Sequence, residues 1–135
     1  MKNYLSTLGD DELGAASNFN NLGVLYQVQE EYEDSEYNFQ RALALREKAL
    51  GTKHKFVAAS LSKLAQFYRK SEKTNAADFH FKRALKTYQE LWGTRHRGTI
   101  NILELYASFL IGVGRRNEAE EYRARAKEIR NLESG

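Results

Sequence analysis

The sequence predicts an all-α fold, a solenoid of stacked antiparallel helix pairs. The stretch "FQRALALREKALGTKH" at residues 39–54 returns as "FKRALKTYQELWGTRH" at residues 81–96. A third, weaker copy keeps the same phase, because Arg83-Ala84 recurs as Arg125-Ala126. Apolar residues inside each copy are spaced as on one face of a helix. Self-similarity at a fixed period is typical of repeat proteins, in which each copy packs only on its neighbours.

Composition limits the class of protein. The 135 residues are enough for one domain, and 41% hydrophobic with 29% charged residues is ordinary for a soluble helical protein. The chain has no cysteine, which excludes disulfides and thiolate chemistry. No apolar run approaches the ~18 residues that a membrane span needs, and the first residues lack the pattern of a signal peptide. We therefore predict a cytoplasmic location.

Residues 1–131 are expected to form one domain that begins with the end of an earlier helix. Gly9 lies 42 positions before Gly51, and Leu8 matches Leu50 and Trp92 in the same register. This register predicts that residues 1–9 are the last turns of a preceding second helix.

The first full repeat is predicted over residues 14–51. Phe19, Leu22, Leu25 and Tyr26 fall on one face of a first helix. The polar stretch "QEEYED" then breaks the pattern before a second helix. Gly51 follows that helix, at a position where glycine suits a left-handed cap.

The second repeat is predicted over residues 56–93 and the third over residues 98–131. Arg123 and Lys127 stand in the third copy where the earlier copies have phenylalanine and leucine. A polar outer helix is what the last repeat of an array needs, so we interpret this helix as a cap. Residues 132–135 are expected to be a frayed tail.

Small residues recur at three positions of the repeat, where helices must approach closely. They are Gly23, Ala65 and Ala107; Ser35, Ala77 and Ala119; and Ala42, Ala84 and Ala126. We interpret all nine as packing positions.

This pattern of small and large residues resembles the tetratricopeptide repeat (TPR). Phe19, Leu22, Gly23, Tyr26, Ser35, Phe39 and Ala42 stand at its consensus positions. The usual period is 34 residues, whereas the 42-residue period, the stretch "NNLGVLY" and the loop histidine look like kinesin light chain repeats. The resemblance implies a right-handed superhelix whose first helices line a concave groove, and a function in protein–protein interaction.

Candidate binding residues are the outward positions of the first helices. They are Asn20, Asn21, Val24 and Gln27 in the first copy, Ser62, Lys63, Gln66, Arg69 and Lys70 in the second, and Asn101, Glu104 and Ser108 in the third. By resemblance, the paired asparagines of the first copy match those that hold extended peptides in kinesin light chains. The three cations of the second copy predict an extended or short helical peptide of acidic character. An ordinary solvated helix surface is the alternative for each position.

Charge is distributed unevenly and suggests a second function. Residues 1–45 carry two basic and eight acidic side chains, net −6, whereas residues 46–135 carry nineteen basic and ten acidic ones, net +9. With Tyr4, Leu5 and Leu8 at an open N-terminal edge, such a dipole favours a self-assembling scaffold or homo-oligomer. Nucleic acid is not the expected partner, because helical-repeat RNA readers use a period near 35 residues.

No constellation for catalysis is recognisable. His54 and His96 occupy equivalent loop positions and are explained by the repeat, and His80 lies within a helix. "GTKH", "GTRH" and "GVGRR" lack the spacing of a phosphate loop. We therefore expect a protein that is not an enzyme and has no metal site or cofactor.

Overall fold

The computed structural model describes residues 4–93 and 96–134, with side chains described for residues 11–93 and 96–132. Its six helices are α1 (Tyr4–Val28), α2 (Tyr32–Leu50), α3 (Lys55–Lys70), α4 (Thr74–Trp92), α5 (Arg97–Gly112) and α6 (Arg116–Ser134). The described ranges contain no strand. The fold is all-α, as predicted.

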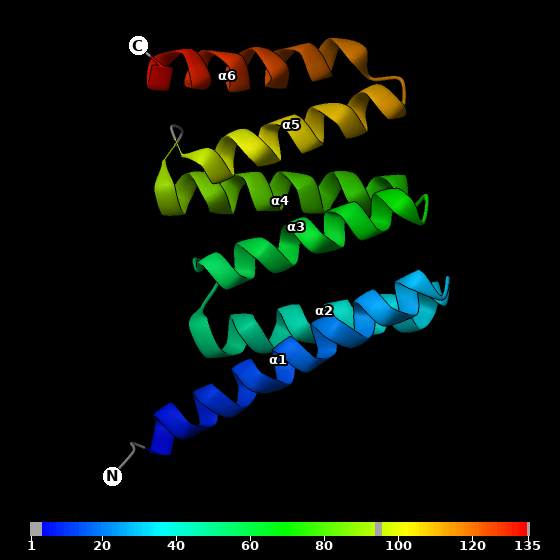
Figure 1. Cartoon of the computed structure of the whole chain (residues 1–135), viewed down its shortest axis with the longest axis vertical. Helices are drawn as coiled ribbons and strands as arrows, with labels where there is room; N and C mark the ends of the chain where they lie inside the picture. Colours follow the sequence, from blue (N-terminus) through cyan, green and yellow to red (C-terminus); the bar gives the residue numbers. More distant parts are fainter. Residues whose placement is uncertain (1–3, 94–95, 135) are drawn as a thin grey trace.

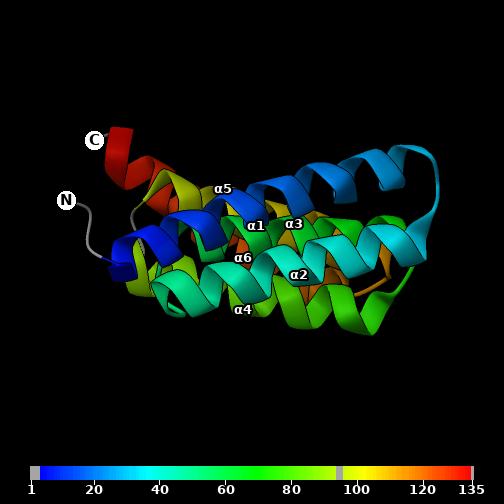
Figure 2. The same cartoon turned by 90° about the horizontal axis from the view of Figure 1, so that it is seen from below.

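The helices pack in chain order and form a right-handed solenoid of antiparallel pairs. α1 packs on α2, α3 on α4 and α5 on α6, while α2 on α3 and α4 on α5 join one pair to the next. Figure 1 shows this order from bottom to top, with the two ends of the chain at opposite ends of the stack. In Figure 2 the first helix of the leading pair lies above its second helix, so the pair forms two layers.

The nine small residues are buried where helices cross, so their assignment as packing positions is confirmed. Ala65, Ala77 and Ala84 are each 0% exposed. At Gly23 an added Cβ would lie 2.7 Å from ring carbons of Phe39, which itself is buried. The Ser35 hydroxyl donates to the Gly23 carbonyl at 2.7 Å. Small residues thus set the distance between the helices of each pair.

Each connection between pairs uses one glycine and one histidine. Gly51 and Gly93 have φ of 82° and 75°, positive as predicted. Their ψ of 176° and −173° is extended rather than left-handed, a region that is essentially open to glycine alone. His54 and His96 then cap α3 and α5, because Nδ1 of each ring accepts a hydrogen bond from the backbone N–H two residues on.

Both ends of the chain differ from the sequence prediction. Residues 4–9 are not a separate helix, because α1 runs through Gly9 and Gly14 without a break. A glycine inside a helix weakens it by only about 1 kcal/mol and need not end it. α6 continues to Ser134, so residues 132–134 are helical rather than frayed. Residues 1–3 and 135 lie outside the described residues.

The apolar face predicted for α1 is partly exposed. Leu22 is 39% and Leu25 is 50% exposed, whereas Phe19 and Tyr26 are half-buried. The four residues lie on one helix, but they do not form a buried face. α1 contacts α2 through its other side, where Ala16 is 0% exposed.

Candidate functional site

The first helices of the three pairs, α1, α3 and α5, form one face of the stack, which we call the first-helix face. Two adjoining depressions, which share Gln27 and Gln66, lie near its centre between α1 and α3. We call the two together the central hollow, and six predicted site residues line it: Gln27, Ser62, Lys63, Gln66, Arg69 and Lys70. Ala59, Phe67 and Tyr88 complete its wall. Neighbouring helices thus bring together residues that are up to 43 positions apart in the sequence (27 to 70).

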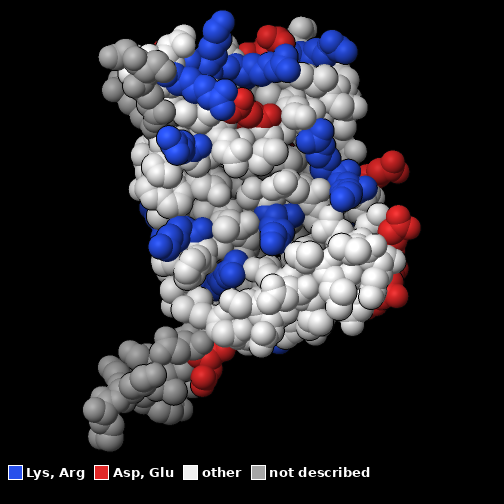
Figure 3. Space-filling model, in the orientation of Figure 1, with Lys and Arg blue, Asp and Glu red and all other residues white. Residues whose placement is uncertain are grey.

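The central hollow is positively charged. Lys63, Arg69 and Lys70 are exposed, and none of them forms an ion pair with a carboxylate of the described residues. Figure 3 shows separate Lys and Arg side chains across the middle of this face, with Asp and Glu mainly at its margins. An anionic ligand would therefore meet cations whose charge is not already compensated by a neighbour.

Cations on the second helices are different, because many of them are paired. Lys48 contacts Glu12 at 3.3 Å, Lys82 contacts Asp78 at 3.1 Å, and Arg83 contacts Glu47 at 3.2 Å. This contrast separates the central hollow from the neighbouring basic surface of α4, whose Lys82, Arg83 and Lys86 are all paired.

Two amides and a hydroxyl add hydrogen-bonding capacity to the hollow. Gln66 Nε2 donates to the Ser62 hydroxyl at 3.2 Å, which holds the amide in place. Ser62 is only 9% exposed and forms part of the floor. Arg69 donates to the Ser108 hydroxyl on α5 at 3.1 Å, which links the central hollow to the next repeat.

Asn20 does not lie on the first-helix face as predicted. Its side chain is 9% exposed and points toward α2. With the amide assigned so that its oxygen faces the guanidinium, this oxygen accepts from Arg46 Nη1 at 2.8 Å and Nη2 at 3.1 Å. Arg46 also donates to the Ser60 hydroxyl at 2.7 Å, and burial lowers the pKa of its guanidinium. Asn20 is therefore a structural residue that fixes α1 and α3 on α2.

The other predicted residues of the first copy are exposed but stand apart from the hollow. Asn21 and Val24 lie on α1 and line neither the central hollow nor the depressions around Arg97 and Thr74. Val24 is 41% exposed. A ligand could reach both residues only by extending beyond the central hollow along α1.

Asn101 and Glu104 belong to a second depression, at the C-terminal end of the first-helix face. It is lined by Arg97, Gly98, Ile100, Asn101, Glu104 and Arg130. Arg130 Nη2 donates to Glu104 Oε1, so this carboxylate is already compensated. Sequence reasoning missed Arg97 and Arg130. The repeat register could have indicated Arg130, because it stands 84 positions, or two repeats, after Arg46.

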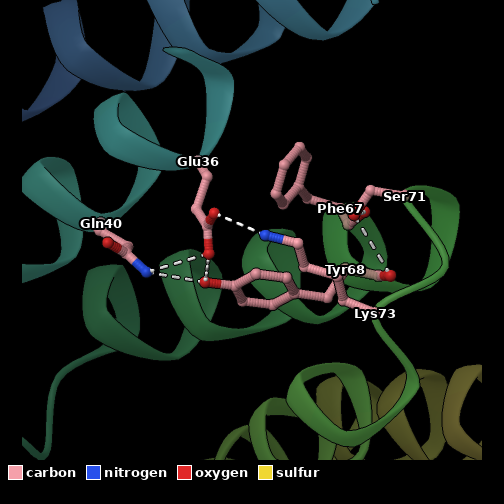
Figure 4. Close-up of polar contacts among 6 residues, drawn as sticks. All are labelled: Glu36, Gln40, Phe67, Tyr68, Ser71 and Lys73. Atoms are coloured by element: carbon pink, nitrogen blue, oxygen red, sulfur yellow. Dashed lines mark hydrogen bonds and ion pairs between the residues drawn. The ribbon is translucent and has the colours of Figure 1, made fainter. Parts of the chain in front are cut away.

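A hydrogen-bonded network joins α2, α3 and the start of α4. Glu36 of α2 accepts from the Tyr68 hydroxyl at 2.7 Å and pairs with Lys73 at 2.9 Å (Figure 4). Gln40 also donates to the Tyr68 hydroxyl, at 2.8 Å. Burial and the hydrogen bond to Glu36 raise the pKa of Tyr68 to about 12. Tyr68 thus stays a neutral donor, which fixes α3 and the residues it presents to the hollow.

The described residues offer no group of three His, Cys, Asp or Glu side chains that could hold a metal ion. His80 Nδ1 lies 2.8 Å from the Ala76 carbonyl oxygen, and its ring packs on Tyr68 with centroids 5.0 Å apart. Burial lowers the pKa of His80. Among the helices of residues 4–93 and 96–134, none has the length and hydropathy required to cross a membrane.

Comparison with known proteins agrees with the repeat architecture. A solved structure, that of BtubC (BKLC) from P. vanneervenii, superposes on 89% of this chain with a TM-score of 0.79 and 24% sequence identity. The match covers 48% of the BtubC chain, so this chain spans about half of that length. No curated protein sequence matches. The family model for the tetratricopeptide repeat matches residues 14–90. With three copies of a helix pair in one register, the chain belongs to the tetratricopeptide repeat family.

Proposed function

We propose that the chain is a non-catalytic interaction module that binds an acidic peptide, extended or short and helical, against the central hollow. Tetratricopeptide repeats are generally protein–protein interaction modules. The observation that carries the acidic specificity is the set of unpaired cations Lys63, Arg69 and Lys70, which stands out against the paired cations of the second helices. The predicted cytoplasmic location stays a prediction.

The peptide backbone has its own partners in this proposal. Gln27 and Gln66 both line the hollow, and a primary amide can accept from one peptide N–H while it donates to a carbonyl. Backbone recognition of this kind demands little of the sequence, so the cations supply the selectivity. The interaction is therefore expected to weaken as salt is added.

Selection from a random peptide display library tests the proposal. The native chain should enrich peptides with an excess of Asp and Glu, and the variant Lys63→Glu, Lys70→Glu should lose that enrichment. Both side chains are exposed, so this variant should keep the thermal stability of the native chain.

The matched control is Lys48→Glu, Lys86→Glu, which makes the same change of charge on α2 and α4, where both side chains are exposed. The control should enrich the same acidic peptides as the native chain. Enriched peptides without acidic excess, or equal enrichment by the two variants, would disprove the assignment.

Self-assembly is the second candidate function, favoured by one observation, the exposure of Leu22 and Leu25 on α1. The side chains of Tyr4, Leu5 and Leu8 lie outside the described residues and add nothing to it. Light scattering over a dilution series distinguishes the two functions, because an assembling scaffold loses mass on dilution and a monomeric peptide binder does not.

A further inference from the structure

Apolar positions of the first helix that are buried in the second and third repeats are exposed in the first repeat. Leu64 and Tyr106 stand where Leu22 stands, and both are 0% exposed, against 39% for Leu22. Phe67 and Phe109 stand where Leu25 stands, with 1% and 2% exposed against 50%. We call Phe19, Leu22, Leu25 and Tyr26 the α1 end face. Its residue types are those of a packed interface.

The second and third repeats show what covers this face. α2 covers α3, with the Phe39 and Phe67 rings 5.5 Å apart, and α4 covers α5, with the Phe81 and Phe109 rings 5.2 Å apart. The two covering helices share one sequence pattern. An acidic residue is followed by phenylalanine at the third position after it, and the dipeptide Ala-Leu begins three residues after the phenylalanine. The pattern reads Glu36, Phe39, Ala42-Leu43 in α2 and Asp78, Phe81, Ala84-Leu85 in α4.

A helix that covers the α1 end face needs a different residue in place of the acid of this pattern. In the second repeat, Glu36 accepts from Tyr68 and pairs with Lys73. Tyr26 stands where Tyr68 stands, so a hydroxyl donor is available, but Glu31 replaces Lys73 at the same N-cap position. A carboxylate would meet Glu31 and be repelled. A glutamine can accept from the tyrosine and donate to the carboxylate.

A second copy of the chain stacked end to end does not supply such a helix. End-to-end stacking would place α6 on α1, and α6 carries Arg123 and Lys127 where α2 has Phe39 and Leu43. Both side chains are exposed in the chain. Arg123 pairs only with Glu120 at 3.7 Å, and Lys127 forms no ion pair with the described carboxylates. Burying these two cations against Leu22 and Leu25 costs more free energy than the apolar contact returns.

We infer that the α1 end face docks an amphipathic helix of a protein partner with the pattern Gln-x-x-Phe-x-x-Ala-Leu. The helix packs its phenylalanine and leucine on Leu22 and Leu25, and its glutamine bridges Tyr26 and Glu31. This site is separate from the central hollow, so one chain holds an acidic peptide and a helix at once.

The probe is a labelled synthetic peptide with the sequence of residues 32–50, carrying glutamine in place of Glu36. A staple between the positions of Glu33 and Tyr37, both exposed in α2, holds it helical and leaves the packing side free. Fluorescence anisotropy should show saturable binding to the native chain. The Leu22→Glu, Leu25→Glu variant should bind at least tenfold more weakly. Circular dichroism should show that this variant keeps its fold, since the two side chains are already 39% and 50% exposed.

Two controls make the test specific. The Lys63→Glu, Lys70→Glu variant, altered only in the central hollow, should bind the helical peptide within twofold of the native chain. A peptide that retains Glu36 should bind at least threefold more weakly than the glutamine form.

Three results would overturn the inference. They are no binding by the native chain, equal binding by the Leu22→Glu, Leu25→Glu variant, and a concentration-dependent dimer of the native chain that this variant abolishes. The last result would make a second copy the occupant. Failure of the peptide selection above leaves this site intact, because the two tests alter different residues.

Discussion

At the scale of the residue, the turns inside the helix pairs carry local strain in two of the three repeats. Glu30 and Glu72 have φ of 62° and 63°, in the left-handed region that side chains other than glycine disfavour. The third repeat has Gly114 there, with φ of 86°. The backbone hydrogen bonds from Glu31 N–H to Tyr26 and from Lys73 N–H to Tyr68, both 2.9 Å, hold this geometry. The tertiary structure thus imposes a conformation that the glutamates do not prefer.

Replacing Glu72 by glycine should therefore stabilise the protein. Relief of the left-handed conformation is worth about 1–2 kcal/mol, and the greater freedom of glycine in the unfolded chain offsets part of it, so we expect a net gain of about 1 kcal/mol. Urea unfolding of Glu72→Gly against the native chain measures it. The control Glu121→Gly, at an exposed position inside α6, should lose about 1 kcal/mol. A loss of stability in both variants would show that φ at residue 72 is not strained.

At the scale of the element, α3 and α5 begin in the same unusual way, with a histidine as the N-cap. His54 Nδ1 accepts from the Phe56 N–H at 3.1 Å, and His96 Nδ1 accepts from the Gly98 N–H at 2.9 Å. Neither helix has an acidic residue in its first turn. The imidazole ring is thus the side-chain acceptor at each of these positive helix ends.

His54→Ala and His54→Asp should separate the cap from the other contacts of the ring. Both variants lose the packing of the imidazole on Phe56, whose ring centroids lie 5.1 Å apart. Only aspartate restores an acceptor and adds a negative charge at the helix N-terminus. Thermal unfolding should place the alanine variant about 1 kcal/mol below the aspartate variant. Equal stabilities would mean that the hydrogen bond to Phe56 contributes nothing.

The helices were largely predictable from sequence because the repeat fixes which positions must be small. Ala77, Ala84 and their equivalents in the other repeats lie at helix crossings, and close packing there tolerates little variation in side-chain size. The exposure of Leu22 was not predictable in this way. A periodic pattern identifies a packing position, but burial also requires a covering helix, and none of the described residues supplies one for α1.

The sequence predicted the exposure of the candidate site residues only in part. Lys63 and Lys70 are outward on α3 by helical phase alone, so the pattern sufficed for them. Asn20 was predicted wrongly because its orientation depends on Arg46, which is 26 residues away on another helix (20 to 46). A side chain at the boundary of a helix face is placed by its hydrogen-bond partner, and helical phase does not identify that partner.

At the scale of the whole molecule, the same polar arrangement joins successive repeats. Glu36 accepts from Tyr68 and pairs with Lys73 at one junction. Asp78 accepts from Tyr106 at 2.6 Å and pairs with Arg115 at 3.1 Å at the next. The acid and the cation are equivalent positions of the repeat, but the tyrosine moves by one helical turn and still delivers its hydroxyl. Burial would raise the pKa of both carboxyls, yet the hydrogen bonds and nearby cations outweigh it and lower them.

The two junctions should therefore make the protein sensitive to acid. A carboxyl whose pKa is lowered by folding stabilises the native state above its unfolded pKa of about 4, and this stabilisation is lost as pH falls through the folded value. The Glu36→Gln, Asp78→Asn variant should be less stable than the native chain at pH 7, by about 1 kcal/mol per junction. Its free energy of unfolding should fall less steeply than that of the native chain between about pH 5 and 3. Urea unfolding at several pH values across that range measures this dependence for both proteins.

The control is Glu33→Gln, which removes an exposed carboxyl outside the two networks and should follow the native profile. Parallel profiles for the double variant and the native chain would show that the junctions contribute equally to stability in their charged and neutral forms.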